Sequence, residues 1–186
     1  MEGRVSYLAG VRAALGGTVN SVAEIGVLRG RFSAALLEAL DPRSLDLVDP
    51  WRPAVDPAYR TSTSAEWDAR YRHVVGRFGS DSRVHIHRMD SLTAAARMDA
   101  GSFDLVYLDA DHREASVFAD LQAWFPKVRR GGFIAGHDFT PDDARTREVV
   151  SACRRFFGDR MAQIVSPLES EPGRGFPRSF FYQVPA

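Results

Sequence analysis

The segment Ala23–Gly30 carries the acid and glycine pattern that is most informative about chemistry. Glu24, Gly26 and Gly30 form Glu-x-Gly-x-x-x-Gly, directly after a short apolar run from Val19 to Val22. Glycine lets the backbone turn sharply and lets a ligand approach where a Cβ would clash. The helix that we expect next would direct its unpaired N–H groups toward that ligand. The pattern therefore predicts a nucleotide-type binding turn between a strand and a helix.

An aspartate further along the chain narrows the kind of ligand. Asp49 follows the apolar run Leu45 to Val48. It lies about 20 residues past the glycine turn, where an acid at the tip of the second strand can accept both ribose hydroxyls. Leu28 interrupts the Gly-x-Gly-x-x-Gly pattern that dinucleotide enzymes use for pyrophosphate. A ligand with a ribose and no pyrophosphate fits better, and S-adenosylmethionine is the common one.

Two further positions have both a ligand-binding and a structural interpretation. Asp90 and Ser91 follow the third apolar run, where such a pair can hydrogen-bond the amino group and a ring nitrogen of adenine. Asp90 can instead be the N-cap of the following helix, and one side chain can do both. Trp51 stands in a proline-rich loop, where it can wall the ligand or simply cover the core.

Acids and histidines gather after the fourth and fifth apolar runs. Asp109, Asp111 and His112 follow one run, and His137 and Asp138 follow the next. Carboxylates and imidazoles that neighbouring strands bring together can hold a divalent metal or supply a general base. The alternative is structural: Asp111 and His112 would cap the next helix, while His137 would orient Asp138.

The elements that must position these residues alternate along the chain. Apolar runs alternate with helical stretches, which favours an α/β protein with a doubly wound, mostly parallel sheet. Ligands bind such a sheet at the carboxyl ends of its strands, where the residues above fall. The last two strands would form an antiparallel hairpin. The expected strands cover residues 19–25, 45–48, 84–87, 103–108, 133–135, 161–165 and 179–184, and the expected helices 7–15, 32–40, 64–78, 92–98, 115–128 and 142–157.

Length, charge and cysteine content restrict the class of protein. At 186 residues we expect one domain, with an N-terminal helix in residues 1–17 and an α/β core in 18–186. The 24 basic residues balance 24 acidic ones, so no net field draws the chain to nucleic acid or to a membrane. The single cysteine, Cys153, excludes an internal disulfide framework, and no apolar run approaches roughly 18 residues. We therefore expect a soluble cytoplasmic protein.

From about residue 19 to 184 the chain resembles the class I S-adenosylmethionine-dependent methyltransferases. The resemblance rests on AEIGVLRG, LDLVDPW, the Asp90-Ser91 pair, FDLVYLDADH and GGFIAGHDF, in that order. The strings LVDPW, LDADH and GHDF resemble a branch of small-molecule O-methyltransferases near the macrocin and catechol types. The resemblance implies a Rossmann-like, seven-stranded sheet in the order 3-2-1-4-5-7-6, with its C-terminal strand antiparallel.

The resemblance also implies roles for the residues of the cofactor site. Glu24 and Gly26 would lie by the methionine moiety of S-adenosylmethionine. Asp49 would lie by the ribose, and the Asp90-Ser91 pair by the adenine. The full set of expected cofactor-binding residues is Glu24, Gly26, Gly30, Asp49, Trp51, Asp90, Ser91 and Asp109.

In the metal-dependent members of this family, an acid after strand four and an acidic or amide pair after strand five bind Mg²⁺. By position these ligands would be Asp109, His137 and Asp138. His137 stands where the family usually has a carboxylate, and histidine is a better ligand for Mn²⁺, Fe²⁺ or Zn²⁺ than for Mg²⁺. Either the metal differs from the usual one, or His137 serves as a base without metal.

These inferences predict O-methylation of a small hydroxylated molecule, such as a sugar, a polyketide or a phenolic metabolite. The acceptor oxygen would attack the sulfonium methyl in line, and Asp111, His112 or His137 would take the proton. One alternative is a non-catalytic protein of the same fold that partners an active subunit. The other is an NAD-dependent oxidoreductase, which Leu28 disfavours.

Recognition of the acceptor needs further parts of the chain. The segment before the first strand can form one helix but not a full lid. Acceptor recognition is therefore expected from the loop 50–63, from the segment 173–178, or from a partner subunit, which a homodimer would supply.

Overall fold

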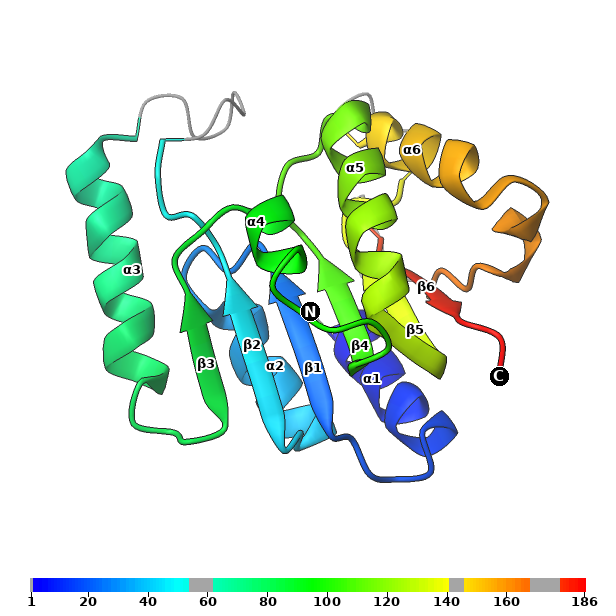
Figure 1. The fold of residues 1–186 in the computed structure, drawn as a ribbon, viewed down its shortest axis with the longest axis horizontal. Coiled ribbons are helices and arrows are strands. Elements are labelled where there is room, and N and C mark those ends of the chain that lie inside the picture. The colour runs from blue at the N-terminus through cyan, green and yellow to red at the C-terminus, as the bar shows by residue number, and fades with distance from the viewer. Residues whose placement is uncertain (1, 54–61, 141–145, 168–177) are drawn as a thin grey trace.

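A computed structural model describes residues 2–53, 62–140, 146–167 and 178–186. The described residues form a six-stranded sheet in the order β3-β2-β1-β4-β5-β6 (Figure 1). β1 to β5 run parallel, and β6 pairs antiparallel with β5. The expected doubly wound, mostly parallel sheet is therefore confirmed. The strands are β1 (Ser21–Ile25), β2 (Ser44–Val48), β3 (Val84–His87), β4 (Phe103–Leu108), β5 (Val128–Gly136) and β6 (Phe180–Gln183).

Helices cover both faces of this sheet (Figure 1). The described α-helices are α1 (Glu2–Ala14), α2 (Arg31–Leu40), α3 (Ser64–Phe78), α4 (Ser91–Ala95), α5 (Glu114–Trp124) and α6 (Arg147–Phe157). Two 3₁₀ helices, η2 (Phe125–Lys127) and η3 (Gly158–Gln163), follow α5 and α6. None of the described helices is both long enough and apolar enough to span a membrane.

The central strand β4 shows how the sequence produces two packed layers. All of its residues are buried, and successive side chains of a strand point to opposite faces. Leu105 and Tyr107 pack with α1, α2 and α3 on one face. Val106 and Leu108 pack with α4, α5 and α6 on the other. Because β4 is covered on both faces, its apolar run is continuous rather than alternating.

The chain reverses direction across the sheet between β1 and β4, which are neighbours in the strand order. β1 leads toward β2 and β3 on one side, whereas β4 leads toward β5 and β6 on the other. Such a switch point leaves a crevice at the carboxyl ends of the two strands. The loops after β1 and β4 contain Gly26 and Asp109, so the fold brings these two sequence signals together.

The predicted strand at residues 161–165 is wrong, and the described sheet therefore has six strands rather than seven. Residues 158–163 form the 3₁₀ helix η3, and Val165 contributes a single antiparallel bridge to Phe181. Met161 and Ile164 both pack against the core. Their spacing of three residues matches the 3₁₀ repeat and places them on one face, whereas a strand would require a spacing of two.

Two helix boundaries also differ from expectation. The helix predicted over 115–128 ends at Trp124, and β5 begins at Val128 rather than at 133. Arg129 lies in that strand and pairs through Nε with Asp104 at 2.5 Å. The β4–β5 register shifts between Phe103 and Leu105, which accommodates the early start of the strand as a bulge does. The predicted start of the last helix at 142 lies outside the described residues, and α6 begins at Arg147.

Candidate functional site

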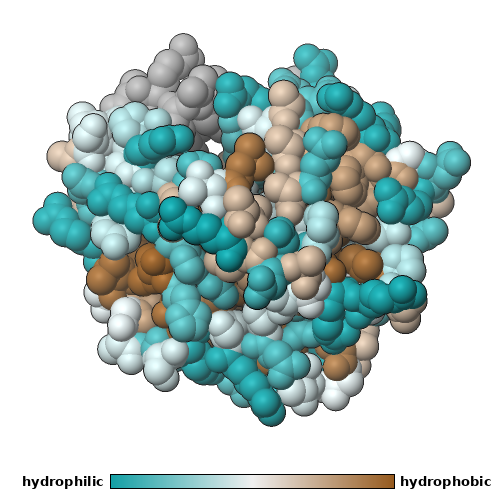
Figure 2. All heavy atoms as spheres, in the orientation of Figure 1, coloured by the Kyte–Doolittle hydropathy of each residue, from teal (hydrophilic) through white to brown (hydrophobic). Residues whose placement is uncertain are grey.

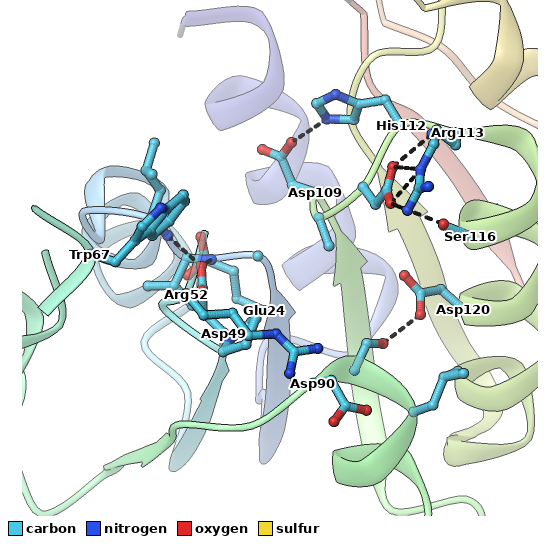
Figure 3. Close-up of a pocket in the computed structure, with 18 of the residues that line it drawn as sticks. Glu24, Asp49, Arg52, Trp67, Asp90, Asp109, His112, Arg113, Ser116 and Asp120 are labelled. Carbon is cyan, nitrogen blue, oxygen red and sulfur yellow. Dashed lines mark hydrogen bonds and ion pairs between the residues drawn. The ribbon is translucent and has the colours of Figure 1, made fainter. Parts of the chain in front are cut away.

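A cavity of about 870 Å³ opens at the carboxyl ends of the central strands, between the glycine turn and helices α4 and α5. Its volume lies within the range that small-molecule and cofactor sites occupy. Figure 3 shows Glu24, Asp49, Asp90, Asp109 and Asp120 around this space. The sequence-predicted residues that line it are Glu24, Gly26, Asp49, Asp90, Ser91, Asp109, Asp111 and His112.

Asp49 holds the glycine turn in place. Its Oδ2 accepts hydrogen bonds from the backbone N–H groups of Val27 at 3.0 Å and Leu28 at 2.9 Å. Its Oδ1 accepts one from the N–H of Trp51 at 2.7 Å. Leu28 and Trp51 have φ angles of 53° and 41°, which non-glycine residues adopt only when the surroundings hold them there. Burial raises the pKa of Asp49, and the three backbone donors oppose this shift.

The glycines of the turn have different neighbours. Gly26 has a φ of 92°, and a Cβ on it would lie 2.1 Å from the backbone oxygen of Asp109. Gly26 is therefore required where the loops after β1 and β4 meet. A Cβ on Gly30 would lie 2.5 Å from the ring of Phe78, so Gly30 is required for packing between the start of α2 and α3. Of the two, Gly26 lines the cavity.

Glu24 and Trp51 are both buried, but they lie differently with respect to the cavity. Glu24 accepts a hydrogen bond from the hydroxyl of Ser33 near the start of α2, and it lines the cavity. Trp51 is fully buried, donates from Nε1 to the carbonyl of Leu28 at 3.0 Å and packs on Tyr71. Of the two interpretations of Trp51, the structure favours the one in which it covers the core.

Sequence reasoning missed several residues of the cavity wall. Trp67 and Arg70 of α3 line the cavity, and the Arg70 guanidinium lies 4.3 Å from the centre of the Trp67 ring. Arg52, from the loop after β2, also lines it. Trp67 shares the buried face of α3 with Val74 and Phe78, and its spacing does not separate a cavity-wall residue from a core residue. The predicted acceptor loop 50–63 lies partly, and the segment 173–178 almost wholly, outside the described residues.

The Asp90-Ser91 pair performs the structural role that its sequence allowed. Asp90 is the N-cap of α4, accepting from the Thr93 N–H at 2.9 Å and the Thr93 hydroxyl at 2.8 Å. These two hydrogen bonds lower the pKa of Asp90. The Ser91 hydroxyl contacts two residues of α5, Asp120 and Trp124. Both members of the pair also line the cavity.

The structure brings together four members of the predicted acid and histidine cluster. His112 Nε2 lies 2.8 Å from Asp138 Oδ2 and 3.7 Å from Asp109 Oδ1. His137 Nδ1 lies 3.5 Å from Asp138 Oδ2 and 3.7 Å from Asp109 Oδ1. Figure 3 shows the contact between Asp109 and His112 at the edge of the cavity. We call Asp109, His112, His137 and Asp138 the acid–imidazole cluster.

Electrostatics within the acid–imidazole cluster decide the charge of His112. Burial alone would lower the pKa of His112, but the adjacent carboxylates of Asp109 and Asp138 outweigh burial and raise it to about 10. Burial would likewise raise the pKa of Asp138, but His112 and then His137 hold it well below its usual range. In this arrangement His112 is an imidazolium that neutralises the two carboxylates, rather than a free base.

Asp111, the remaining predicted catalytic residue, is engaged at the start of α5. Its carboxylate accepts from the Arg113 N–H at 3.0 Å and from the Ser116 hydroxyl at 3.0 Å, and it pairs with the Arg113 guanidinium. Burial would raise the pKa of Asp111, but these contacts leave it lowered. Asp111 therefore holds the chain at the start of α5 through Arg113 and Ser116, although among the described residues it accepts from no N–H group within the helix.

Asp109, His137 and Asp138 fit the donor set of a divalent cation. Each offers one ligand atom, and these atoms all lie within 4.8 Å of one another. Two carboxylates with one imidazole form a mixed oxygen and nitrogen set, which suits Mn²⁺, Fe²⁺ or Zn²⁺ better than Mg²⁺. The three residues follow β4 and β5, which are neighbours in the sheet.

Comparison of the sequence with models of known protein families identifies the class of protein to which this fold and site belong. The model of a family described as a methyltransferase domain matches residues 23–139. This match starts in β1, ends just past Asp138, and includes the glycine turn, Asp49 and the acid–imidazole cluster. The chain belongs to this methyltransferase domain family.

Solved structures share the fold at low sequence identity. Spermidine synthase from Thermotoga maritima has a TM-score of 0.65 and 16% identity over 97% of this chain, which spans 59% of that protein. A putative O-methyltransferase from Klebsiella pneumoniae has a TM-score of 0.65 and 21% identity, covering 98% of this chain and 80% of its own. The N-methyltransferase NodS from Bradyrhizobium japonicum has a TM-score of 0.64 and 14% identity, covering 98% and 95%. The chain has no match among curated proteins.

Proposed function

We propose that this chain is an S-adenosylmethionine-dependent methyltransferase that transfers the methyl group to a hydroxyl of a small molecule. The observation that carries the proposal is the continuity of one cavity. Its wall runs from the glycine turn, with Glu24, Gly26 and Asp49, to Asp109 and His112 of the acid–imidazole cluster. A cofactor bound along the turn would present its reactive end to a group of charged side chains.

Features of the turn support a cofactor with one ribose. Leu28 lines the cavity where a second glycine would let the backbone approach a pyrophosphate. Asp49 is buried at the tip of β2 and lines the same wall. Each oxygen of a carboxylate can accept more than one hydrogen bond, so Asp49 can hold the turn and still accept from a ribose hydroxyl. The same features disfavour NAD.

The acid–imidazole cluster supports activation of a hydroxyl acceptor. Methyl transfer requires the acceptor oxygen to be aligned with the sulfonium methyl and to lose its proton. Asp109, His137 and Asp138 would hold a divalent cation, which when bound lowers the pKa of a coordinated hydroxyl. His112 orients Asp138 from the cavity side. If no cation binds, His137 is the imidazole of the cluster left to take the proton.

Calorimetry tests the cofactor assignment. S-adenosylmethionine and S-adenosylhomocysteine should bind, NAD should not, and each titration is repeated with and without Mg²⁺ or Mn²⁺. Transfer of labelled methyl groups to a panel of sugars and phenols, with and without a chelator, then tests the acceptor class. Binding of NAD alone would favour an oxidoreductase. Binding of S-adenosylhomocysteine without transfer to any acceptor would favour a non-catalytic member of the fold.

A further inference from the structure

Asp120 is a buried carboxylate that the proposed chemistry does not use. It lies on α5 and has 7% of its surface exposed, yet it is part of the cavity wall. Figure 3 shows its carboxylate directed from α5 toward the cavity. Oδ1 accepts from the Ser91 hydroxyl at 2.5 Å. Within the described residues, Oδ2 has no hydrogen-bond partner, and it is not one of the fully buried polar atoms that lack a partner, so it is accessible from the cavity.

Trp124 fixes the direction of the hydrogen bond between Ser91 and Asp120. An indole N–H can only donate, and Trp124 Nε1 donates to Ser91 Oγ at 2.8 Å. The single hydroxyl proton of Ser91 is then directed to Asp120 Oδ1. Oδ2 is left facing the cavity as an acceptor, held in position by two residues that are themselves anchored.

Asp90 lies nearby but is occupied differently. Both of its oxygens accept from Thr93, one from the N–H and one from the hydroxyl, and its side chain is more exposed than that of Asp120. Asp90 is therefore accounted for as the N-cap of α4, and because it is partly exposed, water can meet its remaining acceptor capacity. Asp120 differs, because it lies largely buried in the cavity wall with only Oδ1 engaged, so that Oδ2 is the acceptor left to face the cavity.

The walls around Asp120 suit a flat apolar group. Leu92 of α4 and Ala115 and Ala119 of α5 line the same cavity as Asp120, and both alanines lie on the same helix as Asp120. Leu92 is 49% exposed, which is high for a large apolar side chain. In Figure 2 apolar surface lies over α4 and α5, beside the hollow at the carboxyl ends of the strands. An apolar slot with one buried acceptor matches a heteroaromatic ring that carries one amino group.

We propose that Asp120 Oδ2 accepts a hydrogen bond from the exocyclic amino group of adenine and is the residue that selects the base of the cofactor. The inference rests on the proposed function and assigns to α5 the contact that sequence reasoning gave to the Asp90-Ser91 pair. The electrostatics agree: burial raises the pKa of Asp120 to about 6, and the charges of Asp111 and Asp90 add to the shift. A ligand donor would compensate the desolvated charge.

A double-mutant cycle between protein and ligand tests the contact. The two ligands are S-adenosylhomocysteine and its analogue with hydrogen in place of the 6-amino group, and affinities are measured by calorimetry. Removing the amino group should weaken binding to the wild-type protein roughly tenfold or more, as expected for a hydrogen bond to a charged acceptor. In Asp120→Asn the amide oxygen would accept the hydrogen bond from the Ser91 hydroxyl, and the amide NH₂ group would face the cavity. Removing the amino group should then cost this variant little.

Asp90→Asn is the matched control and should keep the full preference for the amino group. The inference is overturned if Asp120→Asn retains the wild-type preference, or if Asp90→Asn is the variant that loses it. Should Asp120→Asn not fold, a crystal structure of the wild-type protein with S-adenosylhomocysteine decides instead. The amino nitrogen should lie within hydrogen-bond distance of Asp120 Oδ2, and a contact only to Asp90 would reject the inference. If the wild-type protein binds neither ligand, the proposed function itself fails.

Discussion

Asp49 illustrates how a single residue can support both the backbone and the ligand. Three backbone N–H groups from two loops converge on its carboxylate. We expect Asp49→Ala to lower the free energy of unfolding by roughly 2–4 kcal/mol, because buried donors lose their acceptor. Affinity for S-adenosylhomocysteine should fall at least about tenfold, because a ribose acceptor is lost and the turn loosens. Urea unfolding and calorimetry measure the two effects.

The control for Asp49→Ala is Asp68→Ala, which breaks an exposed ion pair with Arg88. Such pairs contribute less than about 1 kcal/mol, so both stability and affinity should be nearly unchanged. Unchanged affinity in a folded Asp49→Ala protein would contradict the assignment of Asp49 to the ribose.

His137 distinguishes the two ways in which the acid–imidazole cluster can act. If His137 binds a metal together with Asp109 and Asp138, His137→Ala should weaken metal binding, and excess Mn²⁺ should restore part of the turnover. As a base, its loss should lower turnover by roughly 10²–10⁴-fold with no rescue by metal. Turnover across a Mn²⁺ titration, at fixed cofactor saturation, separates these outcomes. We expect rescue; full wild-type activity in the presence of a chelator would contradict the metal site.

Asp120 should cost the protein stability in the absence of ligand. Its pKa is raised from 3.8 to about 6, so its protonated form is favoured by folding. That stabilisation is complete below about pH 4 and is lost as the pH rises through 6. The neighbouring charges are Asp90, with Arg52 near it, and Asp111, which is paired with Arg113.

We therefore expect Asp120→Asn to raise the free energy of unfolding at pH 7.5 by roughly 1–3 kcal/mol, since it removes a desolvated charge. The gain should be clearly smaller at pH 5, where the wild-type carboxyl is already largely protonated. Urea unfolding at the two pH values provides the measurement. A gain that is equal at both pH values would show that ionisation of Asp120 is not its source.

At the scale of the elements, the glycine turn joins two loops rather than only clearing space for a ligand. A Cβ on Gly26 would lie 2.1 Å from the backbone oxygen of Asp109 and 2.7 Å from Ala110 Cα. We expect Gly26→Ala to lower the free energy of unfolding by roughly 2–4 kcal/mol, from backbone displacement and a φ of 92°. S-adenosylhomocysteine binding should be lost with it. Gly26→Val should lower the free energy of unfolding further than Gly26→Ala does, and we do not expect its fold to remain largely intact.

The control for Gly26→Ala is Gly76→Ala in α3, where an added Cβ meets no atom within 4 Å. Alanine in the middle of a helix is preferred over glycine by roughly 0.5–1 kcal/mol, so this variant should be slightly more stable and should bind normally. Thermal unfolding and calorimetry of both variants make the comparison. Normal stability of Gly26→Ala would show that the two loops can separate at no cost.

The elements that could be predicted from the sequence are those with strong local signals. The strands at Leu45–Val48 and Phe103–Leu108, and the helix Ser64–Phe78 with its capping box at Thr63, appear where their patterns placed them. The early start of β5 could not be read locally, because it depends on pairing with β4, where Val128 lies opposite Phe103, 25 residues earlier in the chain. The strand expected at 161–165 is wrong, because residues 158–163 form a 3₁₀ helix and Val165 makes only a single bridge to Phe181.

In the candidate site, too, some features could be predicted from the sequence, whereas others depend on contacts between distant parts of the chain. The strand order alone brings Gly26 beside Asp109 and His112 beside Asp138, so their juxtaposition could be predicted. Whether Asp90 or Asp120 faces the ligand could not be predicted from the sequence, because the answer depends on hydrogen bonds between different elements. Asp90 looked like the adenine residue from its place after a strand, whereas Asp120 lies within a helix, and only the Ser91 and Trp124 contacts distinguish it.

At the scale of the whole molecule, charge in the cavity is balanced within the fold. The carboxylates of the acid–imidazole cluster have His112, and Asp111 has Arg113. Asp120 lies apart from these pairs, with Ser91 as its partner in the described residues. Along this one cavity, the neutral amino group of adenine would meet Asp120, and the cationic sulfonium would meet the carboxylates of the acid–imidazole cluster. Five arginines also line the cavity, so Leu28 in the turn, and not charge, is what disfavours the two phosphates of a dinucleotide.

Ligand-linked stability of the whole chain tests this complementarity. A ligand that binds only the folded state stabilises it in proportion to the logarithm of its concentration over Kd, by about 2.7 kcal/mol at 100 times Kd. For a domain of this size, Tm should then rise by roughly 5–10 °C. We expect this shift with S-adenosylhomocysteine and none with NAD at the same concentration, measured by differential scanning calorimetry. Gly26→Ala should show no shift with either ligand, because the turn that forms the wall is displaced. Equal stabilisation of the wild-type protein by NAD would mean that the cavity accepts a pyrophosphate despite Leu28.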